Sequence, residues 1–479
     1  MPTLQSVHRR SFGGSWLPRR SEFLALLGVA LVLTALVVFY PRFSALQQLP
    51  TTSNPQQEQQ QLRDPGDIST VRCRKMQDRH MTEASAPHVL CDATNLLVDT
   101  SKMRLAKCPA QRPNYLCISK SYHRYKLGAF GASCNWPVLN LNDFPKDHLQ
   151  DIMESLESYP ADQWPQAGAI SDTPVLLVTR EFKEHTNVFH TLTDILNVYI
   201  SLRMLGWLGL KRQVVLLDAH PDGPLDGLWA AVAAGGGLDA IAYPWHSKNT
   251  DGRPLLARVD ALPQQITLFR KAIFVPPGYT SLLYAHLYQD NSCPHATPLF
   301  AGFRRFVMEP LGLYNLRPDV KAPIKILLIS RKPYEGKGKV VRRIGNEDEL
   351  VDMLAGMAHV SAELVDLASL SLLEQLSTLA DADILIGMHG AALAYTLLMP
   401  PHAGVIELWA QDKGIWRCYE HTSAWAGLEY RRWQNTDPTR TRVDAAGSDI
   451  TTVDVSAVRL LAEELISAVR QRKASQHAL

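Results

Sequence analysis

Gly387 and Gly390 flank His389 at the point where an apolar stretch ends. Residues 383–387 read as a buried strand and residues 390–399 as a helix. Glycine lets the backbone turn tightly and lets a ligand come close, and the free N–H groups of a helix start attract anions. We therefore expect a phosphate site here, with His389 as a donor or a proton carrier. A plain strand–helix turn with a capping histidine would give the same spacing.

His190 and Asp194 are four residues apart within 188–206, a segment with helical periodicity that ends at a glycine. Residues at this spacing lie on the same face of a helix. A carboxylate beside a histidine can be tuned to remove a proton from a hydroxyl. We expect Asp194 to be a general base, with His190 as the alternative base that Asp194 orients. An ordinary ion pair on a solvated helix face is the structural explanation.

Arg331 follows an apolar strand candidate at 324–330, and Glu407 lies near the end of another at 404–409. A guanidinium at a strand end can hold a diphosphate through two parallel hydrogen bonds. An acidic residue near a strand end can bind the hydroxyl groups of a ribose. We expect both side chains, together with Gly387, His389 and Gly390, to bind a nucleotide-sugar. A surface arginine and a salt-bridged glutamate are the structural alternatives.

Asp381 and Asp383 form the D-x-D pattern that some transferases use to hold a divalent metal. Here the pattern precedes the strand, at the end away from the proposed ligand, and the end of a helix explains it. A helix start together with Arg331 can neutralise a diphosphate without a metal. We therefore expect no metal site and no cofactor.

Strand-like and helix-like segments alternate in two successive blocks, which predicts parallel sheets covered by helices. In open sheets of this kind, ligands bind beyond the C-terminal ends of the strands. No GxGxxG or GxxxxGK[ST] motif occurs, which argues against a soluble oxidoreductase and a P-loop enzyme. The sequence predicts an α/β protein with two Rossmann-like domains facing a cleft.

The N-terminal part of the chain differs from the rest. Residues 23–40 contain no charge and are long enough to cross a bilayer. Four arginines precede this stretch and only Arg42 follows closely, so the N-terminus should stay cytoplasmic. A cleaved signal peptide is the alternative, but Pro41-Arg42-Phe43 makes a poor cleavage site. Residues after 43 are rich in Gln and Pro, as expected of a disordered stem.

Five of the seven cysteines fall between Cys73 and Cys134. Their spacing matches no common zinc pattern, so we expect disulfides of open connectivity in an oxidising compartment. The net charge of +2 gives no reason to expect nucleic-acid binding. The expected division of the chain is a tail (1–22), a transmembrane anchor (23–40), a stem (41–70), a Cys-containing lumenal region (71–173), an acceptor domain (174–320) and a donor domain with a C-terminal helix (321–479).

The segment "IGMHGAALAYTLLMPPHAGVIEL" resembles the signature of glycosyltransferase family 61, in which I-G-x-H-G-A-G-L precedes a proline and a glutamate. The segments "LLVTREFKEHTNVFHTLTDILNVYISLRMLG", "FRKAIFVPPGY" and "SRKPYEGKGKVVRRIGNEDEL" are similar to the family in the same order. The resemblance runs from about Pro174 to Trp433. Ala392 departs from it, because the family usually has glycine there, and the extra methyl group would tighten the pocket.

This resemblance implies a GT-B-like architecture, a UDP-sugar donor, a glycoprotein or N-glycan acceptor, and inversion at the anomeric carbon. The upstream motifs are similar to plant N-glycan β-1,2-xylosyltransferases, so we expect xylose transfer to the N-glycan core. The segments around His389 and "WRCYEH" look closer to EGF-domain-specific O-linked N-acetylglucosamine transferase, which makes that activity the alternative. A non-catalytic glycan-binding protein is a second alternative.

With the predicted anchor, the expected location is the Golgi or ER membrane, single-pass type II, with the catalytic region in the lumen. The oligomeric state and the donor sugar stay open at this point.

Overall fold

The structure is a computed structural model, and one compact unit spans Asp67–Leu479. It describes residues 69–76, 88–105, 123–133, 141–144, 149–160, 163–180, 186–280, 295–314, 318–332, 340–410 and 416–477. The predicted tail, the anchor at 23–40 and nearly all of the stem lie outside these ranges, as do Cys108, Cys117, Cys134 and Cys293. Within the described ranges, no helix is long and apolar enough to cross a membrane.

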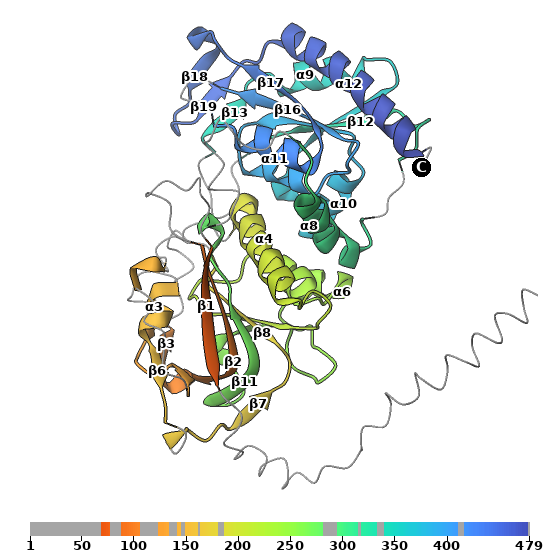
Figure 1. Cartoon of the computed structure of the whole chain (residues 1–479). Helices are drawn as coiled ribbons and strands as arrows, with labels where there is room; N and C mark the ends of the chain where they lie inside the picture. The colour runs from red at the N-terminus through yellow and green to blue at the C-terminus, as the bar shows by residue number, and fades with distance from the viewer. Residues whose placement is uncertain are drawn as a thin grey trace, which may run out of the picture. The chain divides into compact units, whose positions relative to one another are not determined.

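The first sheet has nine strands in the described part of the chain (Figure 1). Its order is β10-β9-β8-β11-β2-β5-β6, with β1 beside β2 and β7 beside β11. The strands are β1 (Thr70–Met76), β2 (His88–Asp99), β5 (Phe130–Ala132), β6 (Leu156–Ser158), β7 (Ala169–Ser171), β8 (Val175–Val178), β9 (Gln213–Leu216), β10 (Leu256–Arg258) and β11 (Ile266–Phe274).

This first sheet is mixed, whereas the sequence predicted a parallel one. The strands from β8 to β11 pair in parallel, but β2 runs antiparallel to both β11 and β1. Strands β1 and β2 come from the cysteine-containing region, where no helical pattern in the sequence predicts a parallel crossover. The sheet therefore extends across residue 174, where the acceptor domain was expected to begin.

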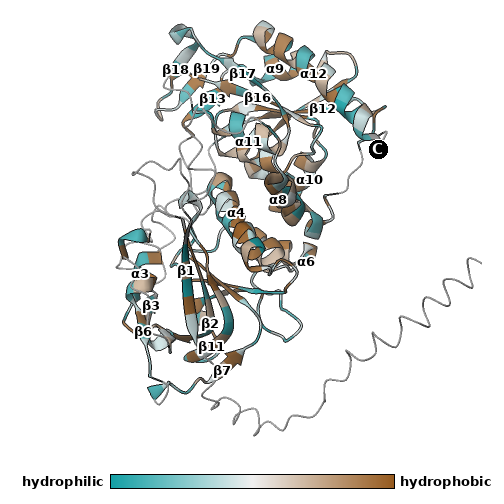
Figure 2. Ribbon diagram, viewed as in Figure 1, coloured by the Kyte–Doolittle hydropathy of each residue, from teal (hydrophilic) through white to brown (hydrophobic). Residues whose placement is uncertain are grey.

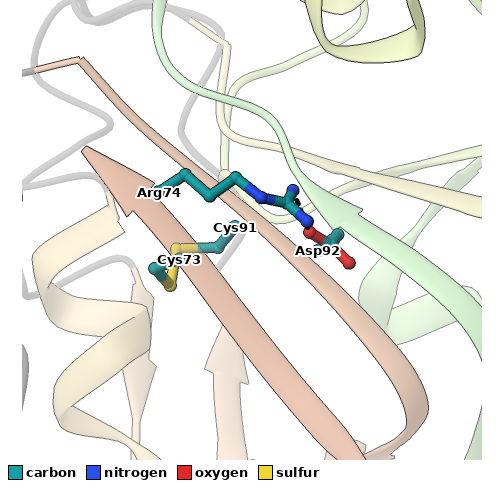
Figure 3. The surroundings of a disulfide bond; sticks show 4 residues. All are labelled: Cys73, Arg74, Cys91 and Asp92. Atoms are coloured by element: carbon teal, nitrogen blue, oxygen red, sulfur yellow. Dashed lines mark hydrogen bonds and ion pairs between the residues drawn. A yellow bond between two sulfur atoms is a disulfide. The ribbon is translucent and has the colours of Figure 1, made fainter. Parts of the chain in front are cut away.

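One disulfide joins the two N-terminal strands. Cys73 and Cys91 are register partners in the antiparallel β1–β2 pair, and their sulfur atoms are bonded (Figure 3). The adjacent pair, Arg74 and Asp92, forms an ion pair with 2.7 Å between Nη1 and Oδ1. Cys418 is a free, buried thiol. The observed disulfide agrees with the expectation of an oxidised N-terminal region.

The second sheet is parallel throughout, as the alternating pattern predicted. Its order is β14-β12-β15-β16-β17. The strands are β12 (Ile324–Ile329), β14 (Val360–Val365), β15 (Ile384–Met388), β16 (Gly404–Trp409) and β17 (Glu429–Gln434). A three-stranded sheet, β13-β19-β18, accompanies it, and β3 pairs with β4 in an antiparallel two-stranded sheet. The strands of these two smaller sheets are β3 (Met103–Leu105), β4 (His123–Tyr125), β13 (Arg342–Ile344), β18 (Thr441–Val443) and β19 (Asp449–Thr451).

The helices pack against these sheets, and a large hydrophobic cluster includes residues from strands of both main sheets. Figure 2 shows hydrophobic residues along α4, which lies over the first sheet. The helices are α3 (Leu149–Glu154), α4 (Val188–Leu205), α5 (Asp226–Leu228), a π-turn at Trp229–Ala233, α6 (Leu238–Ala242), α8 (Pro298–Met308), α9 (Glu347–Ala355), α10 (Leu372–Ala380), α11 (Cys418–Ala426) and α12 (Val455–His477). Short 3-10 helices include η8 (Gly278–Thr280) and η11 (Ala391–Leu397).

Helix α4 forms where the sequence predicted it. The side chain of Asn187 caps its first turn by accepting a hydrogen bond from the Phe189 N–H. Gly206 ends it in the left-handed conformation, with φ of 70°. Residues 191–199 are all buried, and the helix packs against both η8 and η11. Helix α4 therefore connects the two halves of the described unit.

Candidate active site

The parallel pairing of β15 with β16 brings His389 and Glu407 together. Gly387 is the register partner of Glu407, and Met388 is the partner of Leu408. The His389 N–H continues this ladder by donating to the Leu408 carbonyl at 2.8 Å. His389 Nδ1 is hydrogen-bonded to Glu407 Oε1, and both residues are buried. Two residues 18 apart in sequence thus form a histidine–carboxylate pair at the C-terminal edge of the sheet.

The second oxygen of Glu407 binds groups from β17. The Tyr430 hydroxyl donates to Oε2 of Glu407, and an Arg432 nitrogen lies 3.6 Å from the same oxygen. Arg432 Nε also donates to the Tyr430 hydroxyl at 2.9 Å. The carboxylate has no solvent exposure, so these polar partners compensate for its burial. Tyr430 and Arg432 were not among the predicted site residues, although their alternation within "EYRRWQ" is a strand signal.

Burial lowers the pKa of His389 below its usual value of 6.5, while Glu407 opposes the change and nearby arginines add to it. The imidazole is therefore neutral at pH 7. A carboxylate can only accept hydrogen bonds, so the proton sits on Nδ1 and Nε2 carries a lone pair. In this form Nε2 can take a proton from a hydroxyl but cannot donate to a phosphate.

Three aromatic rings surround the His389 imidazole. The centroid of Trp409 lies 4.0 Å away, that of Tyr419 5.1 Å away and that of Trp416 5.6 Å away. Trp409 and Tyr419 are buried, but Trp416 is 45% exposed. Large exposed aromatic rings are typical of binding surfaces, because they offer apolar area at small entropic cost.

Helix α4 meets this aromatic group at its first turn. The Phe189 ring lies 6.1 Å from Tyr419 and 5.5 Å from the half-buried His190 ring. Ring contacts thus run from His389 through Tyr419 and Phe189 to His190. The two histidines expected to do chemistry, 199 residues apart in the sequence, belong to one neighbourhood.

Asp194 faces the turn that follows β11. Its carboxylate is buried and accepts a hydrogen bond from the Gly278 N–H at 2.5 Å. One helical turn on, Asn197 donates to the carbonyls of Pro276 and Pro277. A Cβ on Gly278 would lie 2.8 Å from the Asp194 oxygen, so only glycine permits this approach. These contacts show Asp194 fixing the Pro276–Gly278 turn.

Arg331 lies where expected, beside the turn of residues 388–390 that carries His389, which we call the histidine loop. Its Nη1 donates to the His389 carbonyl at 3.0 Å. A Cβ on Gly390 would come within 2.7 Å of the same nitrogen, so this glycine makes room for the guanidinium. Gly390 has an extended backbone, with φ of 164°. A Cβ on Gly387, by contrast, would meet the Ile329 side chain at 3.3 Å, inside the sheet.

The element after His389 differs from the helix that we expected. Residues Ala391–Leu397 form a 3-10 helix of seven residues. Such a short, tight helix has a smaller dipole and fewer free N–H groups than a full α-helix. Arginine side chains, rather than a helix start, therefore supply the main positive charge beside His389.

Both carboxylates of the D-x-D pattern bind cations at the opposite end of β15. Asp381 pairs with Lys325 at 2.9 Å. Asp383 is buried and pairs with Lys473 at 2.9 Å and with His402 at 3.1 Å. Within the described residues, no group of three or more His, Cys, Asp or Glu could hold a metal ion. These contacts give the pattern a structural role.

Comparison with known proteins adds to this geometry. The model of the family "Glycosyltransferase 61" matches residues 188–406, from the start of α4 into β16. The chain carries a glycosyltransferase 61 domain. This domain contains His190, Asp194, Arg331 and His389, and it ends one residue before Glu407.

Curated relatives of this chain include two kinds of transferase. Beta-1,2-xylosyltransferase of Arabidopsis thaliana is 26% identical over 363 residues, covering 65% of this chain and 62% of the relative. EGF domain-specific O-linked N-acetylglucosamine transferase of Xenopus laevis is 27% identical over 298 residues, covering 61% and 52%. The chain thus spans less than two thirds of these relatives. A solved structure, E. coli heptosyltransferase WaaC with ADP-2-deoxy-2-fluoro heptose, matches 61% of this chain and 99% of its own, with 12% identity and a TM-score of 0.26.

Proposed function

We propose that this protein is an inverting glycosyltransferase that moves a sugar from a UDP-sugar to a glycan on a glycoprotein. The observation that carries the proposal is the way the glycosyltransferase 61 segment folds. Phe189, at its start, reaches Tyr419, and Tyr419 packs on His389, near its end. Polar groups that the sequence singled out far apart therefore lie around one aromatic group.

An inverting transfer needs a base for the acceptor hydroxyl and positive charge for the departing diphosphate. His389 suits the first task, because Glu407 fixes its tautomer and Nε2 is free of a proton. His190 is the alternative base from the first turn of α4. Asp194, the base that the sequence favoured, is a further candidate, and its carboxylate also accepts the hydrogen bond from Gly278. Arg331 supplies positive charge beside the histidine loop.

The donor we propose is UDP-xylose, with transfer in β-1,2 linkage to the N-glycan core. Support for xylose and for the β-1,2 linkage comes from the two plant relatives, which are named beta-1,2-xylosyltransferases. Transfer of N-acetylglucosamine to protein is the second candidate, supported by relatives of similar identity that cover up to 72% of this chain. We also propose a GT-B arrangement of the two halves, independence of divalent metal, and anchoring in the Golgi or ER membrane through residues 23–40.

The test is transfer by the full-length chain in detergent, with UDP-xylose or UDP-N-acetylglucosamine and with an N-glycan or an EGF-domain acceptor. We expect product from UDP-xylose and the N-glycan, with equal rates in EDTA and in Mn²⁺. Product from UDP-N-acetylglucosamine and the EGF domain would replace the donor and acceptor but keep the reaction class. Binding of glycan without transfer from either donor would leave the non-catalytic alternative.

A further inference from the structure

Arg342 differs from the other arginines near the candidate active site. It lies at the start of β13, which packs against β15, the strand that leads to His389. Its Nε is buried and has no hydrogen-bond partner. Among the residues that the structure describes, its side chain forms no ion pair either, and its register neighbour Asp449 on β19 stays beyond pairing distance.

The next residue shows that this arrangement is specific to one face of β13. Successive side chains of a strand point to opposite faces. Arg343, on the other face, lies 3.7 Å from the Asp444 carboxylate. The two consecutive arginines therefore differ in their surroundings. Arg343 pairs with a carboxylate at the edge of the small sheet, whereas Arg342 points away from that carboxylate, toward the main sheet.

The surroundings of Arg342 are those of the candidate active site. Its charge acts on His389 and Tyr419, and the charge of Glu407 acts on it in return. Glu407 is already hydrogen-bonded to His389 and Tyr430, with Arg432 at 3.6 Å. The Glu407 carboxylate therefore already has its partners, and Arg342 remains without an anionic partner among the described residues.

A half-buried guanidinium without an anionic partner is unfavourable, because desolvation opposes its charge. Burial accordingly lowers the pKa of Arg342 below its usual value. A purely structural arginine would be expected to form hydrogen bonds, as Arg432 does with Tyr430 and Glu420. A guanidinium matches the oxygens of a phosphate through parallel hydrogen bonds. The missing partner is therefore best supplied by a ligand.

We propose that Arg342, together with Arg331, binds the diphosphate of the nucleotide-sugar donor and stabilises it as the leaving group. The inference rests on the proposed function. In the transfer, the acceptor oxygen attacks the anomeric carbon and its proton passes to the base. The bond from that carbon to the diphosphate oxygen breaks, and the electron pair remains on the diphosphate. Arg342 then meets a more negative group than in the ground state, as a stabiliser of the transition state should.

The experiment compares Arg342→Met, Arg342→Lys and the adjacent control Arg343→Met in the full-length chain. Calorimetry would measure the affinity for UDP, UMP and inorganic pyrophosphate. We expect Arg342→Met to weaken UDP and pyrophosphate at least about tenfold, UMP less, and to leave the melting temperature of the free protein unchanged or raised. Arg342→Lys keeps the charge without the fork, so its loss should be smaller. Arg343→Met should bind all three like the wild type.

Each result decides between distinct conclusions. If the wild type binds UDP and Arg342→Met binds it within twofold, Arg342 has no role in binding the diphosphate. A lower melting temperature in Arg342→Met, with UDP affinity kept in Arg342→Lys and Arg343→Met alike, would make Arg342 a structural residue. Arginine-dependent binding of pyrophosphate without any binding of UDP would keep the anion site and reject the nucleotide-sugar function. Binding of neither would reject both.

Discussion

Each main sheet carries a buried cluster of charges beyond the C-terminal ends of its strands. The two clusters differ in how fully their charged groups are paired with other protein groups. In the first sheet, Arg180 follows β8 and Asp218 follows β9. The guanidinium of Arg180 binds Asp218 at 2.8 Å and Asp226 at 2.9 Å, and it donates to the carbonyls of His220 and Pro221. All three nitrogens of this guanidinium have protein acceptors.

The cluster of the second sheet is less complete. His389, Glu407, Tyr430 and Arg432 satisfy one another, but Arg342 has no described partner and Trp416 is 45% exposed. A cluster whose charges are all paired stabilises the fold by itself. One with an unpaired cation and an exposed aromatic ring is ready for a ligand. Position at a strand end is therefore not enough to assign function, and the balance of partners decides.

The largest expected effect is a loss of stability when the cluster of the first sheet loses the cation of Arg180. Arg180→Met would leave Asp218 and Asp226 buried without their cation, so we expect a loss of about 3–5 kcal/mol in the free energy of unfolding. Urea denaturation measures it. The control is Arg74→Met, which removes the partly exposed pair with Asp92 (Figure 3) and should cost about 0–1 kcal/mol. Equal, small losses in the two variants would remove the distinction between the clusters.

A comparable change, this time in rate, is expected at His389. His389→Gln removes the base that we propose, so kcat should fall by about 10²–10⁴, with a smaller change in KM for the donor. Asp194→Asn keeps a hydrogen-bond acceptor for Gly278 and should lose much less activity. Steady-state kinetics with both substrates gives the ranking. If Asp194→Asn lost more activity than His389→Gln, Asp194 on α4 would be the better candidate for the base.

A smaller effect is expected where glycine makes room for Arg331. In Gly390→Ala, the new Cβ would lie 2.7 Å from Arg331 Nη1, so the flexible guanidinium must move away from the histidine loop. We expect the donor KM to rise about tenfold, equivalent to about 1.4 kcal/mol, with little change in melting temperature because the backbone is already extended. The matched variant Gly387→Ala meets Ile329 instead. If it raised the KM equally, the effect would not come from Arg331.

The smallest effect concerns pH. Because burial lowers the pKa of His389, the unfolded chain binds a proton more readily than the folded one below the usual histidine pKa of about 6.5. The contribution of His389 to the free energy of unfolding is complete above a pH of about 6.5, and it is lost as the pH falls toward the lower pKa of the folded state. We expect about 1.4 kcal/mol per unit of lowering, measured as the difference in unfolding free energy between pH 7.5 and 5.5. His389→Gln should show a weaker pH dependence, whereas an unchanged slope would contradict a neutral imidazole.

The sequence predicted the second sheet better than the first. Apolar runs between helical patterns gave β12, β14, β15 and β16 close to their observed ends, since a parallel sheet needs exactly such crossovers to connect its strands. The capped helix α4 was equally clear. Strands β1 and β2 have no such local signal, because their pairing with β11 depends on contacts between distant segments.

The candidate site was predicted in part. Motif spacing pointed to His389, Glu407 and Arg331, and the structure brings them together. Hydrophobic patterns reveal burial but not which polar groups become partners, so Tyr430 and Arg432 were missed. The hydrogen bond from Gly278 to Asp194 could not be predicted from the helix either, because the donor is a backbone N–H 84 residues away.

The contact between Asp383 and Lys473 has a consequence for the order in which the chain folds. Asp383 is synthesised 90 residues before Lys473, so at a rate of about 5–20 residues per second several seconds pass before the ammonium emerges. Until then the carboxylate beneath β15 lacks one of its cations, and the buried face of α12 is missing from the hydrophobic cluster of the second sheet. Chain elongation therefore delays completion of the half that holds His389, whereas strands β8 to β11 are available earlier.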